Sequence, residues 1–191
     1  MTARLVIMGP QGSGKGTQAA RLAERLGIPT ISTGDIFRAN ITGGTELGVL
    51  AQKYTAKGDL VPDSVTNDMV SDRLAQPDAA EGFILDGYPR NAAQVVELDE
   101  ILSEHGATLD AVIELTADHD ELLARLTRRA QIEGREDDTE QAIARRLDIY
   151  AEQTAPLTRA YADRGLLVQV DGIGDMDEIT ERLATALVGR V

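Results

Sequence analysis

Residues 9–17 read GPQGSGKGT, a glycine-rich stretch that joins an apolar run at 5–8 to a helical pattern at 15–26. Glycine lets the backbone turn tightly without Cβ clashes, so several amide N–H groups can gather around one anion. The N-terminus of the following helix adds the positive end of its dipole, and Lys15 can reach a terminal phosphate. The stretch therefore predicts a phosphate-binding loop. A purely structural glycine-rich turn is the alternative.

The residue after the lysine departs from the general phosphate-loop pattern. That pattern has Ser or Thr there as a Mg²⁺ ligand, whereas this chain has Gly16 and then Thr17. We therefore expect a metal ion to be held by nucleotide oxygens, water and another carboxylate. The candidate is Asp86, which ends a predicted strand and precedes Gly87, and a plain Asp-Gly turn is the alternative.

Short apolar runs and longer helical patterns alternate along the rest of the chain. The runs predict five strands, at 5–8, 30–32, 83–85, 111–115 and 166–170. Strands that alternate with helices indicate βαβ crossovers and a parallel sheet with helices on both faces. We therefore predict one α/β domain over residues 1–191.

Two stretches interrupt this alternation. Residues 34–76 carry only helical patterns and predict a small helical insert between the second and third strands. Residues 130–138 read AQIEGREDD, which is polar, contains glycine and has no periodicity. That composition predicts a short mobile loop between two helices.

Composition excludes several classes of function. The net charge of −13 argues against nonspecific binding to nucleic acid or to an anionic membrane. The chain has no Cys and two His, so disulfides, thiolate catalysis, Cys-ligated zinc and an imidazole-rich metal site are not expected. No apolar stretch reaches the length of a membrane span, and the N-terminus lacks the apolar core of a signal peptide. We expect a cytoplasmic protein.

Seven segments, which together cover nearly the whole chain in order, resemble the nucleoside monophosphate kinases, and the adenylate kinases in particular. They are GPQGSGKGTQ (9–18), STGDIFR (32–38), FILDGYPRNAAQ (83–94), RLTRR (125–129), GREDDTEQAIARR (134–146), QTAPL (153–157) and VDGIG (170–174). One departure is Gln11, where the family usually has Pro, Ala or Gly. It leaves the backbone donors of the loop in place.

The resemblance implies a P-loop NTPase-type three-layer α/β/α fold with a five-stranded parallel sheet. It implies an NMP-binding insert at 32–61 and a short lid at 130–138 that lacks the structural zinc of long-lid relatives. The reaction implied is reversible, Mg²⁺-dependent transfer from ATP to AMP that yields two ADP and maintains the adenine nucleotide balance. The implied partners are the nucleotides ATP, AMP and ADP, and a monomer is expected.

Site residues are implied position by position. The catalytic residues would be the basic side chains Lys15, Arg90, Arg129, Arg135 and Arg146. ATP would contact the phosphate loop, two arginines of one predicted helix and a turn near the C-terminal end of the chain. These residues are Gly12, Ser13, Gly14, Lys15, Gly16, Thr17, Arg125, Arg129 and Gly174. Asp86 would hold Mg²⁺ through water. Arg125 and Arg129 are four residues apart, an unfavourable pairing unless an anion or an acid lies between them.

AMP would contact a second set of residues. These are Thr33, Arg38, Asp59, Leu60, Val61, Gly87, Tyr88, Pro89, Arg90, Gln94, Arg135 and Arg146. A Gln amide offers a donor and an acceptor together, which suits the adenine edge. The alternatives are that Thr33 caps the following helix, that Gln94 is an exposed helix position, and that the arginines are solvated surface charges.

We also make a hypothesis about how the site closes. Closure would depend on arginine–phosphate contacts alone, with Asp137 and Asp138 tethering the loop through exposed ion pairs that contribute little. Removal of Arg135 would then lower turnover strongly and leave the melting temperature almost unchanged. Two rival functions stay open: a kinase for CMP, UMP or dAMP, and a nucleotide-binding switch. The chain has no N-K-x-D guanine-recognition string, which weakens the second.

Overall fold

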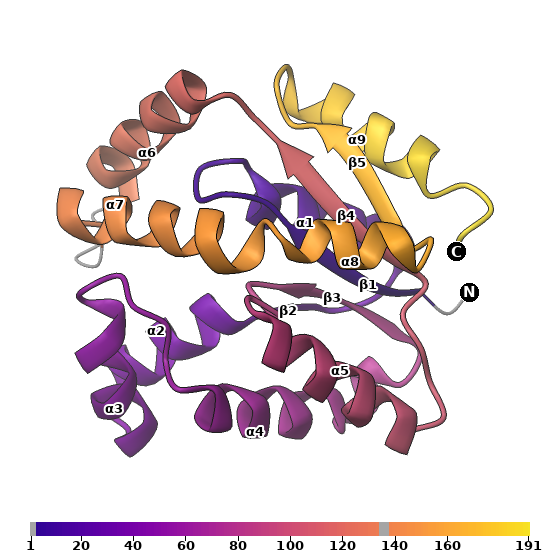
Figure 1. Ribbon diagram of the computed structural model, residues 1–191, viewed down its shortest axis with the longest axis horizontal. Coiled ribbons are helices and arrows are strands. Elements are labelled where there is room, and N and C mark those ends of the chain that lie inside the picture. Colours follow the sequence, from indigo (N-terminus) through magenta and orange to yellow (C-terminus); the bar gives the residue numbers. More distant parts are fainter. Residues whose placement is uncertain (1–2, 134–137) are drawn as a thin grey trace.

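A computed structural model describes residues 3–133 and 138–191. Within these ranges one sheet has five parallel strands in the order β2-β3-β1-β4-β5 (Figure 1). The strands are β1 (Ala3–Met8), β2 (Thr30–Ser32), β3 (Gly82–Asp86), β4 (Ala111–Thr116) and β5 (Leu167–Asp171). The predicted fold class and the five predicted strands are confirmed, each strand boundary to within two residues.

Helical elements connect the strands. In chain order they are α1 (Lys15–Leu26), α2 (Thr33–Gly43), α3 (Glu46–Thr55), α4 (Asp63–Leu74), the 3₁₀ turn η1 (Pro77–Ala79), α5 (Ala92–Glu104), α6 (His119–Glu133), α7 (Glu140–Ile149), the π-helical turn η2 (Tyr150–Thr154), α8 (Leu157–Asp163) and α9 (Met176–Ala186). The first of these begins and ends where the helical pattern at 15–26 predicts.

Side-chain alternation in the strands divides the core into two layers. In β1, Leu5 and Ile7 pack with α1 and α9 on one face of the sheet. Val6 and Met8 point to the other face, where α4, α5 and α8 cover them. Both faces are buried, and this is why the strands read as continuous apolar runs rather than as alternating patterns.

The predicted helical insert at 34–76 divides in the structure. Its helices α2 and α3 form a separate small core around Phe37, Ala51 and Val61 and lie together at one end of the sheet (Figure 1). The third helix, α4, returns to the sheet and buries Val70 and Leu74 in the second layer. Only α2, α3 and the segment after them therefore project from the main body.

The first four residues of the predicted loop at 130–138 are helical. Residues 130–133 continue α6 to Glu133, because Ala, Gln and Glu are strong helix formers and the first glycine comes only at position 134. Residues 134–137 lie outside the described ranges. The chain is described again from Asp138, and Thr139 caps α7 by accepting a hydrogen bond from the Ala142 amide.

The sheet topology locates one crevice. β1 and β3 are neighbours, yet the helices after them leave in opposite directions: α1 leads to β2 and α5 leads across to β4. Ligands of open α/β sheets bind at the carboxyl ends of such strands. Separately, in the parts of the chain that are described, no helix is long and apolar enough to cross a membrane.

Candidate functional site

A cavity of about 1510 Å³ lies at the carboxyl ends of β1 and β3. Every predicted site residue except Arg135 lines it. These residues are Gly12, Ser13, Gly14, Lys15, Gly16, Thr17, Thr33, Arg38, Asp59, Leu60, Val61, Asp86, Gly87, Tyr88, Pro89, Arg90, Gln94, Arg125, Arg129, Arg146 and Gly174. Arg135 lies outside the described residues. Segments far apart in sequence are therefore brought to one concave surface.

The phosphate loop leaves β1 and enters α1 at Lys15. Gly12 and Gly14 both have φ +88, in the left-handed region that side chains disfavour. A Cβ on Gly12 would also lie 3.1 Å from the Leu122 carbonyl oxygen. The loop therefore requires glycine for both conformation and space, and its N–H groups stand at the N-terminus of a helix, which favours an anion.

Among the described residues, basic side chains reach this cavity from six elements or loops. Burial lowers the pKa of Lys15, and the nearby charges of Arg90, Arg129 and Arg38 lower it further, whereas Asp86 opposes this effect. Burial likewise lowers the pKa of Arg90, with additional repulsion from Arg146 and Arg38. A site that gathers so many cations gains by binding a polyanion, because bound negative charge relieves both the desolvation and the repulsion.

The charge opposite these cations is Asp86, the last residue of β3. The residue is 9% exposed, and its Oδ1 accepts no hydrogen bond from any described residue. A Cβ on Gly16 would lie 3.5 Å from Asp86 Oδ2, so the missing side chain leaves space beside the carboxylate. An orphaned carboxylate oxygen next to a phosphate loop fits a hydrated divalent cation. Over residues 3–133 and 138–191, no group of three or more His, Cys, Asp or Glu forms a metal cluster.

Arg90 is held by three hydrogen bonds, and a fourth fixes the Gly87 carbonyl to which its side chain donates. Its Nε donates to the Gly87 carbonyl (2.8 Å), and its backbone N–H donates to Gln94 Oε1 (2.7 Å). The Thr33 hydroxyl donates to the same Gly87 carbonyl (3.1 Å). Thr154, in the π-helical turn η2, donates its hydroxyl to the Arg90 carbonyl (2.6 Å). These contacts hold the guanidinium against the cavity wall, so little side-chain entropy remains to be lost on binding.

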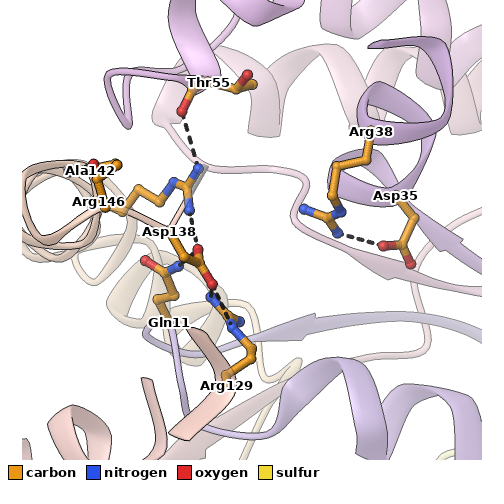
Figure 2. Close-up of polar contacts among 9 residues, drawn as sticks. Gln11, Asp35, Arg38, Thr55, Arg129, Asp138, Ala142 and Arg146 are labelled. Carbon is orange, nitrogen blue, oxygen red and sulfur yellow. Dashed lines mark hydrogen bonds and ion pairs between the residues drawn. The ribbon is translucent and has the colours of Figure 1, made fainter. Parts of the chain in front are cut away.

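Two alternatives from the sequence are wrong. Thr33 does not cap α2, because the Ser32 hydroxyl does so by accepting from the Asp35 amide. Gln94 is not an exposed helix position, because it is 2% exposed and lines the cavity. Arg38, for its part, reaches Asp35 within its own helix at 2.5 Å (Figure 2), and its side chain is 36% exposed.

Two of the three arginines of α6, Arg125 and Arg129, each have their own acid. Arg125 pairs with Glu121 at 2.6 Å and donates to the Ser13 and Gly172 carbonyls, so it joins the phosphate loop to the turn after β5. Arg129 pairs with Asp138, with 2.7 Å between Nη2 and Oδ2. Each arginine therefore has a separate counter-charge, whereas the sequence analysis expected one anion or acid between the two.

The expectation that Asp138 forms exposed pairs of little value is wrong. Its side chain is fully buried, and Arg129 and Arg146 approach its carboxylate from opposite sides (Figure 2). Arg146 Nη1 lies 2.9 Å from Oδ1, which also accepts from Gln11 Nε2 at 3.2 Å. The unusual Gln11 thus extends the phosphate loop toward this carboxylate. Asp137 lies outside the described residues.

Contacts between α7 and the end of α3 join the two sides of the cavity. Arg146 donates to the Thr55 carbonyl at 3.2 Å, and Arg145 Nε lies 2.8 Å from Asp59 Oδ1. Gly58 packs directly on the α7 backbone, since a Cβ there would lie 2.4 Å from the Ala142 carbonyl oxygen. The expectation that closure depends on phosphate contacts alone therefore leaves out a direct protein contact.

Sequence reasoning missed several side chains around the site. Asp63 and Thr154 support Gln94 and Arg90 from behind, and Asn91 caps α5 by accepting from the Gln94 amide at 2.9 Å. A signal for Asn91 was available, because Asn before a helical pattern is a preferred cap. No local signal marks Asp63, whose partners are 28 and 31 residues away.

Comparisons with known proteins point to one family. A family model described as adenylate kinase matches residues 7–166. The chain is 62% identical over 184 residues to the adenylate kinase of Kocuria rhizophila, which covers 96% of this chain and 98% of that protein. It is 56% identical over 187 residues to the adenylate kinase of Thermobifida fusca (98% of this chain and 99% of that protein). It is 60% identical over 184 residues to that of Bifidobacterium longum (96% and 99%).

Proposed function

The chain belongs to the adenylate kinase family, and on that premise we propose that it catalyses Mg·ATP + AMP ⇌ 2 ADP by direct in-line phosphoryl transfer. As a member of that family it is a nucleotide phosphotransferase. The proposal concerns the acceptor, the metal dependence and the residues that carry the reaction. The observation that carries it is one cavity whose described lining combines a phosphate loop, eight Lys and Arg residues and the buried Gln94.

The donor nucleotide would lie on the β1 side of the cavity. The loop amides and Lys15 would hold its phosphates, with Arg125 and Gly174 toward the far end near β5. The acceptor would lie on the β3 side, with its phosphate on Arg38 and Arg90 and its base near Thr33 and Gln94. The segment Asp59, Leu60 and Val61 and the turn Gly87, Tyr88 and Pro89 would form the walls around it.

This arrangement can transfer phosphate without a protein nucleophile. A phosphate oxygen of AMP attacks the γ-phosphorus while the bond to the β-phosphate oxygen breaks, and ADP leaves on each side. Catalysis then consists of positioning the two phosphates and neutralising the charge between them. Lys15, Arg90, Arg129 and Arg146 would supply that charge, and Arg135 is proposed to join them from the sequence alone. An arginine of this type can contribute on the order of 10³ to 10⁵ in turnover.

The residues present fit a hydrated Mg²⁺ at the same place. Asp86 would hold it through water, in keeping with its unpartnered Oδ1. When bound, the ion would neutralise charge on the donor phosphates. Because Gly16 has no hydroxyl, this chain supplies no side-chain ligand from the position after Lys15.

Water is the competing acceptor, so the reaction needs a closed site. The segments 32–61 and 130–138 are proposed as the NMP-binding insert and the short lid. Their roles are supported by α2 and α3, which form their own small core beside the sheet, and by the contact of α7 with the end of α3.

A coupled assay tests the function. Purified protein is incubated with Mg·ATP and, in separate reactions, with AMP, dAMP, CMP and UMP, and ADP formation is followed. ADP formation with AMP supports the proposal, and loss of activity on chelation of Mg²⁺ supports the metal dependence. Higher kcat/KM with another monophosphate would favour the rival kinase, and no product with any acceptor would overturn the proposal.

The remaining expectations accompany this proposal. The acidic balance argues against nucleic-acid and membrane partners, the lack of Cys and of an apolar span in the sequence leads us to expect a cytoplasmic protein, and the family resemblance leads us to expect a monomer. Light scattering during size-exclusion chromatography checks the oligomeric state. A mass near the 20.5 kDa of one chain is the expected result, and a mass twice as large would contradict it.

A further inference from the structure

Gln94 is held by groups that allow its amide only one orientation. Its Oε1 accepts the backbone N–H of Arg90 at 2.7 Å, and its Nε2 donates to Asp63 Oδ1 at 2.8 Å. A backbone N–H can only donate, and an ionised carboxylate can only accept. A flipped amide would set its oxygen against the Asp63 carboxylate and its NH₂ group against the Arg90 N–H. Both hydrogen bonds would become repulsive contacts.

The surroundings of Asp63 strengthen this arrangement. Asp63 begins α4, and its Oδ1 also accepts from Asn91 Nδ2 at 3.0 Å. The Asn91 side-chain oxygen in turn accepts the Gln94 backbone N–H at 2.9 Å. Asp63 is thus tied to both ends of the first turn of α5. Because Gln94 is 2% exposed, water cannot readily replace these partners.

The fixed amide still has capacity for a ligand. Its oxygen has a second lone pair, and its nitrogen has a second hydrogen. Gln94 therefore offers the cavity an acceptor and a donor in a set order. An adenine edge matches that order, because its 6-amino group donates and its N1 accepts. Hypoxanthine and guanine have the opposite order, since their 6-oxo group accepts and their N1–H donates.

We infer that Asp63, which does not line the cavity, determines the preference for a 6-amino over a 6-oxo purine monophosphate by fixing the amide of Gln94. This inference rests on the proposed function, and it adds a positioning residue behind the base-binding residue. A Gln that could flip freely would serve both classes of base. The carboxylate removes that freedom, because it makes the alternative amide orientation unfavourable. Cytosine has the same donor and acceptor order as adenine. The fixed amide therefore distinguishes amino bases from oxo bases, whereas selection of a purine over a pyrimidine depends on the cavity walls.

The test compares AMP with IMP, which differ only in the groups at positions 6 and 1 of the base. The probe variant is Asp63→Asn, whose amide can donate as well as accept and so permits the flipped Gln94. The matched control is Asp68→Asn, an exposed carboxylate on the same helix. The measured quantity is the ratio of kcat/KM for AMP to kcat/KM for IMP. That ratio does not depend on the fraction of protein that is folded.

We expect the ratio to fall on the order of tenfold in Asp63→Asn, because one of the two groups that oppose the flip is lost. The change should come from KM, with AMP weakened and IMP improved, while Asp68→Asn keeps the wild-type ratio. If Asp63→Asn does not fold, Asp63→Ser replaces it, because a hydroxyl can also donate or accept.

The outcomes separate the inference from the function. If the wild-type protein forms ADP from AMP and the folded Asp63 variant changes the ratio less than twofold, the inference is overturned and the proposed function stays intact. If neither the wild-type protein nor Asp68→Asn forms ADP from AMP, the proposed function fails, and the inference fails with it.

Discussion

Arg145 forms an ion pair with Asp59, with 2.8 Å between Nε and Oδ1, and so joins α7 to the segment that follows α3. Asp59 raises the pKa of Arg145 above its usual value, chiefly through this hydrogen bond. The pair connects α7, which follows the proposed lid, to the proposed NMP-binding insert. Arg146, the next residue, continues the contact by donating to Thr55.

Asp59→Asn should weaken acceptor binding without unfolding the protein. Both side chains are partly exposed, so the melting temperature should stay within about 1 °C of the wild type. The closed arrangement should be less populated, which raises the KM for AMP by about two- to fivefold and leaves kcat nearly unchanged. Steady-state kinetics at low ionic strength check this. The effect should fade in high salt, where the pair is screened.

Glu46→Gln is the matched control, because it removes an exposed negative charge from the same insert, at the start of α3. An equal rise of KM in this control would attribute the effect to net charge rather than to the pair with Arg145.

Gly58→Ala should be more damaging than Gly44→Ala, although both glycines adopt left-handed backbone conformations. Their φ values are +79 and +64, and alanine costs about 1–2 kcal/mol at either position. A Cβ at 58 would also lie 2.4 Å from the Ala142 carbonyl oxygen, whereas nothing lies within 4 Å at 44. Denaturant unfolding and kcat/KM measure the difference. Equal losses in the two variants would show that Gly58 is not in close contact with α7.

Asp138→Asn should destabilise the free protein because it removes a buried counter-charge shared by Arg129 and Arg146. Breaking a fully buried pair costs about 3–5 kcal/mol, and we expect about 2 kcal/mol here because the two guanidiniums remain partly exposed. Bound nucleotide supplies negative charge to the same arginines. The increase in melting temperature on addition of ATP should therefore be larger in the variant than in the wild type.

Gln11→Ala is the control for that variant, since it removes only a neutral donor 3.2 Å from Asp138 Oδ1. It should cost about 1 kcal/mol or less. A loss as large as that of Asp138→Asn would mean that the carboxylate acts through packing and hydrogen bonding rather than as a counter-charge.

ATP affinity should fall at an alkaline pH that is lower than the usual lysine pKa of 10.5. Burial and neighbouring arginines lower the pKa of Lys15 in the free protein, and only its charged form binds phosphate well. Affinity is then complete below the lowered pKa and is lost as pH rises through it. Burial raises the pKa of Tyr150, which also lines the cavity, to about 12, so that group stays neutral in this range.

Calorimetric titrations across alkaline pH measure this effect, with Lys15→Arg as the control. A guanidinium keeps its charge in that range, so the loss of affinity should be absent from the variant. If the wild type and Lys15→Arg lose affinity in parallel, another group is responsible.

The phosphate loop, the five strands and the residues that line the cavity could be predicted from the sequence because each is encoded within a short segment. Lys15 follows a glycine-rich turn, and Asp86 ends an apolar run, so local patterns place both at strand ends. The predicted loop at 130–138 was partly wrong, because helix propensity carried α6 through Glu133. The role of Asp138 was misjudged because exposure depends on what packs around a residue, and no local pattern records that.

The sequence by itself determined the order of the strands, the fold class, the family and the identities of the groups that line the cavity. Only the tertiary structure decided how those groups are held. Asp63 meets Gln94, Asp138 lies between Arg129 and Arg146, and Arg145 reaches Asp59 across 86 positions of the chain. Local propensities act over a few residues, whereas burial, charge compensation and the orientation of an amide are set by partners that only the folded chain brings within hydrogen-bonding distance.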